Sequence, residues 1–149
     1  MVPRAARLLH GALLAAALAA PWGAAPAAAQ TGFVVIVNES NPLQDLSRQQ
    51  LADIFMRRMT TWPGGGSIHP VDLPAVSETR DAFSRAVHGR PAAAVASYWG
   101  QQVFAGRAVP PPQRPTDRAV VEFVRGDAAS IGYVAPGSAT VGVKTVAVY

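Results

Sequence analysis

The chain has 149 residues, of which 50% are hydrophobic and only 15% charged, with a formal net charge of +4 and no cysteine. The lack of cysteine excludes a disulfide framework, a thiolate zinc site, an iron–sulfur cluster, a cysteine nucleophile and a cysteine-linked lipid. The low charged fraction and the many Val, Leu and Ala residues argue against a mainly disordered chain. The arginines are scattered rather than clustered, so we expect no nucleic-acid partner.

The N-terminal segment has the three-part composition of a secretory signal peptide. Arg4 and Arg7 precede an apolar run from Leu8 to Ala20, and a stretch of small residues ends at Ala29. The run holds about 13 residues, whereas a membrane-spanning helix needs about 20, so a retained anchor is the weaker alternative. We expect a signal peptide over residues 1–29 with cleavage after Ala29, one domain over residues 30–149, and a periplasmic or secreted protein.

Strand and helix patterns alternate along the rest of the chain. The apolar run 33–37, β-branched after Phe33, lacks polar alternation, which predicts a strand covered on both faces. Ser47 and Gln50 form a capping-box pattern, so a helix should begin at Ser47. Other helices are expected after Ser77, from Pro91 to about Val103, and after Thr116, with strands in 67–72, 130–134 and 141–149. This alternation predicts a layered α/β domain with a mostly parallel sheet and flanking helices.

The segment 72–83 is the main candidate for a binding site. It reads as a strand end and a loop, followed by Ser77-Glu78-Thr79-Arg80 at the opening of a helix. First-turn N–H groups, two hydroxyls and an arginine suit an oxyanion such as phosphate. The alternative is that Ser77 only caps the helix, while Glu78 offsets the positive helix end and would repel an anion.

Ser40 and Asn41 follow the first predicted strand and form a second candidate. In a parallel sheet the carboxyl ends of strands share one rim, so we expect these residues beside the helix opening as further hydrogen-bond donors. The alternative, which the Asn41-Pro42 pair favours, is a plain turn.

The patterns of enzymes and metal sites are missing from the sequence. It has no Gly-x-Ser-x-Gly elbow, and Gly64-Gly65-Gly66 lacks the lysine and helix of a phosphate-binding loop. His69 and Asp72 are three apart in a presumed strand and should point to opposite faces, which disfavours a shared metal ion. We therefore expect a protein that is not an enzyme and has no cofactor and no metal site.

Six short segments occur in an order that resembles the second lobe of periplasmic phosphate-binding proteins, the substrate-binding components of phosphate ABC transporters. The segments are 33–37, 51–55, 60–62, 77–79 followed by Phe83, 121–124 and 130–134. The resemblance implies a single type 2 periplasmic-binding-protein-like lobe that binds phosphate or another small oxyanion. It also implies a role in ABC transport, with an ABC permease as a partner.

The helix opening departs from the motif of that family, which reads Arg-x-Asp-Gly-Ser-Gly-Thr and holds phosphate. Ser77 and Thr79 match its Ser and Thr, but Leu73 and Ala75 replace its Arg and Asp, and Glu78 replaces its second Gly. These changes remove a positive charge and add a negative one.

Two hypotheses follow from the match and the departures. The first is an exported, non-catalytic solute-binding domain for phosphate or a similar oxyanion, in which Arg80 supplies a substitute cation by turning back over the helix end. The alternative is a degenerate single lobe that binds no ligand and interacts with another envelope protein. A homodimer that pairs two lobes is also open.

Overall fold

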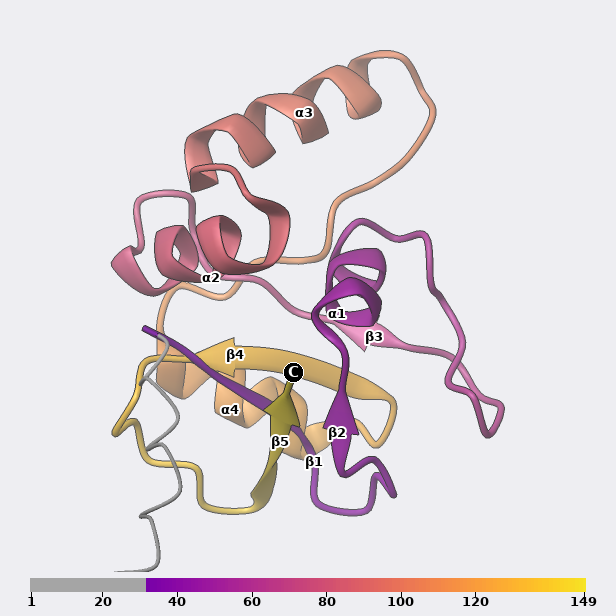
Figure 1. Cartoon of the computed structure of the whole chain (residues 1–149), viewed down its shortest axis with the longest axis vertical. Coiled ribbons are helices and arrows are strands. Elements are labelled where there is room, and N and C mark those ends of the chain that lie inside the picture. Colours follow the sequence, from indigo (N-terminus) through magenta and orange to yellow (C-terminus); the bar gives the residue numbers. More distant parts are fainter. Residues whose placement is uncertain (1–31) are drawn as a thin grey trace, which may run out of the picture.

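The structure is a computed structural model that describes residues 32–149, so the predicted signal peptide and its cleavage site lie outside the described residues. The described chain forms five strands and four helices (Figure 1). In chain order they are β1 Val34–Asn38, β2 Asp45–Leu46, α1 Arg48–Phe55, β3 His69–Pro70, α2 Glu78–His88, α3 Ala92–Phe104, α4 Asp117–Gly126, β4 Ser130–Val134 and β5 Val143–Val148.

The strands form one sheet with the order β2-β5-β1-β4-β3. The central strand β1 is antiparallel to both β4 and β5, and only the short edge pairs β2–β5 and β3–β4 are parallel. The predicted α/β lobe is confirmed, but the prediction of a mostly parallel sheet is wrong. Burial on both faces is typical of parallel strands, but it requires only that other elements cover the strand, and here an antiparallel strand is covered in the same way.

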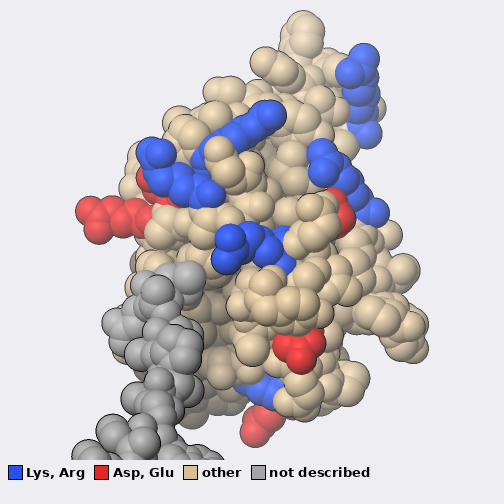
Figure 2. Space-filling view, viewed as in Figure 1, with Lys and Arg blue, Asp and Glu red and all other residues tan. Residues whose placement is uncertain are grey.

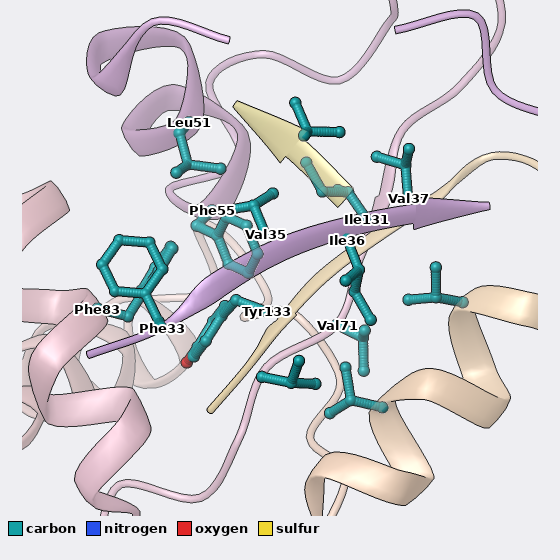
Figure 3. Packing of buried hydrophobic residues seen from close by; sticks show 14 of the residues in the cluster. Phe33, Val35, Ile36, Val37, Leu51, Phe55, Val71, Phe83, Ile131 and Tyr133 are labelled. Carbon is teal, nitrogen blue, oxygen red and sulfur yellow. The ribbon is translucent and has the colours of Figure 1, made fainter. Parts of the chain in front are cut away.

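Both faces of β1 are covered, as its unbroken apolar run predicts. Val35 points toward Leu51 and Phe55 of α1, whereas Ile36 points to the other side, toward Val71 and α4 (Figure 3). These side chains are at most 2% exposed. The sheet therefore lies between α4 on one side and α1 with α2 on the other.

Three of the four helices begin at predicted caps. Ser47 forms a full capping box with Gln50, and the side chains of Ser77 and Thr116 each accept a hydrogen bond from a first-turn N–H group. The helix α3 begins after Pro91, without a side-chain cap, and lies beyond α2 at the far end of the molecule from β5 (Figure 1).

The predicted strand over 67–72 shrinks to the two residues of β3. Pro70 has no N–H group to donate, which confines this segment to the edge of the sheet. The Val71 N–H still donates to the Ile131 carbonyl oxygen of β4, whereas the Asp72 N–H donates to the Pro112 carbonyl oxygen, so the chain leaves the sheet after Val71 and enters the loop before α2. This loop and the first turn of α2 hold the candidate site.

Candidate functional site: the first turn of α2

The opening of α2 has unused hydrogen-bond donors. The Ser77 hydroxyl oxygen accepts a hydrogen bond from the Arg80 N–H at 3.3 Å, so its own proton is available to donate outward. Within residues 32–149 the structure records no acceptor for the N–H groups of Glu78 and Thr79, the first two of the helix. Such groups carry the positive end of the helix dipole. Ser77 and Thr79 are half-buried and Glu78 is exposed, so the turn faces solvent.

The Arg80 side chain turns back under the helix end, where it is only 2% exposed. Its Nη2 atom lies 3.0 Å from Oδ2 of Asp72, and Nη1 donates to the Leu73 carbonyl oxygen at 2.6 Å. The Leu73 N–H donates to Oδ1 of the same Asp72 carboxylate at 2.9 Å. The guanidinium therefore bridges the end of the β3 segment to α2 inside the protein.

Tyr133 of β4 completes this buried cluster by donating its hydroxyl proton to Oδ1 of Asp72. Its ring stacks on Phe83 of α2 at a centroid distance of 3.8 Å. Burial raises the pKa of Asp72 above its usual value, although Arg80 and the hydrogen bond from Tyr133 act in the opposite direction. Burial and the neighbouring Asp72 charge both raise the pKa of Tyr133, so the phenol stays protonated as a donor.

This cluster changes the role expected for Arg80. The side chain turns back, as the hypothesis required, but its charge is neutralised by Asp72 rather than directed toward solvent. An anion at the first turn of α2 would therefore meet N–H groups and hydroxyls without an adjacent uncompensated arginine. The Asp72–Tyr133 contact joins residues 61 apart in the chain and could not be predicted from the sequence. A carboxylate directly after an apolar strand was the only local signal.

Ser40 and Asn41 lie at the opposite end of the sheet from α2. Phe33, before β1, packs against Phe83 of α2, whereas Asn38 at the end of β1 donates to the last turn of α4 (Figure 1). The expectation of a shared rim is wrong because β1 is antiparallel to β4, so its carboxyl end lies opposite that of β3.

The segment that holds Ser40 and Asn41 is a turn, which was the alternative prediction. The Ser40 hydroxyl donates to Oδ1 of Asn38 at 2.7 Å, and Oδ1 of Asn41 accepts from the Leu43 N–H at 2.9 Å. The two residues also border a cavity of about 600 Å³ beside Trp62, which Ser77 and Thr79 do not line. They are therefore separate from the candidate site at α2.

The two described histidines lie away from the first turn of α2. His69 of β3 is paired through Nδ1 with Asp127 at 2.6 Å, not with Asp72. Among residues 32–149, no group of three or more His, Cys, Asp or Glu side chains is placed to hold a metal ion. The same residues include no helix that is both long and apolar enough to span a membrane.

Comparisons with known proteins agree with this fold. A family model described as a PBP superfamily domain matches residues 25–143. Among solved structures, the chain is similar to a protein from Clostridium perfringens described as a phosphate ABC transporter substrate-binding protein with bound phosphate. The two share 26% identity with a TM-score of 0.62, over 78% of this chain and 44% of the other.

Two further solved structures share the fold at lower identity. An ABC-type phosphate transport receptor from Vibrio cholerae is 20% identical with a TM-score of 0.57, over 78% of this chain and 46% of the receptor. PstS from Borrelia burgdorferi is 13% identical with a TM-score of 0.55, over 78% and 47% of the two chains. The chain thus spans less than half the length of these proteins. Comparison with curated protein sequences gives no significant match.

Proposed function

The chain belongs to the family described as the PBP superfamily domain, and from this premise we propose that it is an exported, non-catalytic domain that binds phosphate or a similar small oxyanion. The observation that carries the proposal is the first turn of α2, where two N–H groups lack an acceptor in the described chain beside the hydroxyls of Ser77 and Thr79. The likeness to a Clostridium perfringens protein with bound phosphate supports the choice of ligand. Transport with an ABC permease is part of the proposal.

The chemistry of the turn sets the expected affinity. Helix N-termini attract anions through their dipole and their N–H groups, but this turn faces solvent and Arg80 is already paired with Asp72. Hydrogen bonds exposed to water contribute little net free energy, so we expect a dissociation constant of about 1 mM for phosphate. Glu78 lies at the first helical position and repels a bound anion.

Calorimetric titration of the purified protein with inorganic phosphate tests the proposal. Joint replacement Ser77→Ala and Thr79→Val should weaken binding about tenfold by removing two donors. The matched control is Ser97→Ala on α3, whose hydroxyl donates to its own helix and which should leave binding unchanged. Glu78→Gln should tighten binding about threefold because it removes a negative charge. Absence of saturable binding up to about 10 mM phosphate would refute the proposal.

A second candidate function is an interaction module in the cell envelope that binds no small ligand. It is favoured by the apolar surface at the carboxyl end of α3, where Phe104 is 97% and Val103 53% exposed. Large exposed apolar side chains in a group are typical of protein contact surfaces. The partner is another envelope protein or a second copy of the chain.

The two functions respond differently to the same substitutions. If the partner is another envelope protein, Phe104→Ser should abolish cross-linking to it. If the partner is a second copy of the chain, Phe104→Ser should abolish the concentration dependence of the elution volume in gel filtration. Ser77→Ala with Thr79→Val should leave that contact intact. A partner that is lost with the α2 variant and kept with Phe104→Ser would exclude this second function.

A further inference from the structure

A second pocket lies at the other end of α2, away from the first turn. It encloses about 370 Å³ between the last turn of α2, the first half of α3, and α1 with the residues that follow it. Its polar lining comprises Arg58, Arg90, His88, Gln49 and Tyr98. Pockets of this size hold small organic molecules, whereas inorganic phosphate alone would leave most of the volume to water.

The charge around this pocket is positive. Arg58 is 62% exposed at its side chain and is partly neutralised by Asp53 at 3.5 Å, whose carboxylate also accepts a hydrogen bond from Gln49 at 3.1 Å. For the Arg90 side chain the structure records no partner within residues 32–149. Neither Asp nor Glu is among the described residues that line the pocket. Figure 2 shows Lys and Arg side chains gathered over the part of this face formed by α1, α2 and α3.

His88, the last residue of α2, is half-buried in the wall of the pocket. Burial and the charges of Arg58 and Arg80 lower the pKa of His88 to about 4, so the ring is neutral at pH 7. Of the charged groups near it, Arg80 is neutralised by Asp72 and Arg58 is partly neutralised by Asp53, while Arg58 and Arg90 line the pocket. A neutral imidazole can still offer one N–H donor to an anion.

The rest of the lining is apolar or aromatic. Val87 of α2 and Val95 of α3 are buried, and the Tyr98 ring makes an edge-to-face contact with Trp99 at a centroid distance of 5.3 Å. Two guanidinium groups over an apolar wall match a ligand with an anionic head and an apolar body. Guanidinium groups bind carboxylates and phosphates alike, so the lining specifies this shared chemistry.

We propose that this pocket is a binding site for a small organic anion, a carboxylate or a phosphate monoester, held by Arg58 and Arg90 with its apolar part against Val95 and Tyr98. The site is separate from the first turn of α2, and it does not depend on phosphate binding there. Occupation would place a negative charge near His88, which favours its protonated form.

NMR titration of the purified protein with phenyl phosphate and, separately, with benzoate tests this proposal. We expect saturable shifts of the His88 ring signals at about 1 mM ligand and a pKa of His88 that moves up toward its usual range. The ligand that binds more tightly identifies the preferred anionic group. Arg90→Gln and Arg58→Gln should each weaken binding about tenfold by removing a charged donor.

Two matched variants distinguish binding in this pocket from binding elsewhere on the protein. Arg107→Gln removes an exposed arginine beyond the opposite end of α3 and should leave binding unchanged, as should Ser77→Ala with Thr79→Val. No saturable shift of His88 with either ligand would overturn the proposal, as would equal binding by Arg90→Gln and the unmodified protein. A loss caused by the Ser77 and Thr79 variant would show that the ligand binds at the first turn of α2 instead.

Discussion

The Arg80–Asp72 pair provides the sharpest test of how the loop before α2 is held. Replacing Arg80 with methionine keeps most of the side-chain volume but leaves the Asp72 carboxylate buried without its counterion. The two side chains are only 2% and 9% exposed, and their charged atoms lie 3.0 Å apart. Removing one partner of a buried ion pair typically costs about 3 to 5 kcal/mol. The lost hydrogen bond to the Leu73 carbonyl is part of this cost.

That cost is large compared with the stability of a domain of this size. For about 120 residues the free energy of unfolding is expected to be about 6 to 18 kcal/mol, and the entropy of unfolding about 0.25 kcal/mol per kelvin. A loss of about 4 kcal/mol would therefore lower the melting temperature by about 15 °C. Urea denaturation followed by circular dichroism measures the free energy directly, and thermal melting measures the shift.

A matched control lies on the same helix. Arg85 pairs with Asp81 at 2.6 Å, but its side chain is 63% exposed, so Arg85→Met should leave the urea midpoint nearly unchanged. A double-mutant cycle with Asp72→Asn measures the interaction energy between the two side chains. The double variant should lose at least about 2 kcal/mol less stability than the sum of the losses of the two single variants. A cost of less than about 1 kcal/mol for Arg80→Met, or additive effects of the two single variants, would show that the ion pair does not stabilise this loop.

Three further predictions concern pH, packing and capping. Burial and nearby arginines lower the pKa of His88 from 6.5 to about 4, so the unfolded chain binds a proton below pH 6.5 that the folded protein does not. The free energy of unfolding should therefore fall as the pH drops from 7 to 4. The contribution of His88 to this fall should be about 2 kcal/mol after allowance for its partial exposure. In urea denaturation at each pH, His88→Gln should lack this contribution. Gly132→Ala would place a methyl group 2.7 Å from Cγ1 of Val120, so it should destabilise the protein by about 2 kcal/mol in the same assay. An unchanged urea midpoint would contradict the tight packing of α4 on β4. Ser47→Ala removes the cap of α1 and should cost about 1 kcal/mol, whereas a Ser97→Ala control should cost less.

Local patterns in the sequence predicted the elements of this fold well. The capping box at Ser47 and the caps at Ser77 and Thr116 act within one helical turn, so adjacent residues are sufficient to specify them. The buried strand 33–37 was equally clear, because a short, unbroken apolar run rich in β-branched residues and followed by turn-forming residues favours a strand covered on both faces. The family resemblance, which the matching family model confirms, rests on the order of such local segments.

Contacts between distant residues decided the candidate site, and no local pattern contains them. The direction of β1 relative to β4 and β5 depends on how these distant segments pair. Because the pairing is antiparallel, Ser40 and Asn41 lie at the end of the sheet opposite the first turn of α2. The sequence likewise predicted Arg80 at the opening of α2, but it did not predict that Asp72 neutralises its charge. Asp72 in turn accepts a hydrogen bond from Tyr133 of β4, 61 residues further along the chain.

The sequence by itself therefore determined which residues open α2 and that Ser77 caps it, because capping is a short-range interaction. Only the tertiary structure decided which charged side chains are free to contact a ligand. Asp72 neutralises the charge of Arg80 within the core, whereas Arg58, which follows α1, and Arg90, which lies between α2 and α3, line one pocket at the other end of α2. Electrostatic interactions depend on distance and burial in space, and neither can be read from spacing along the chain.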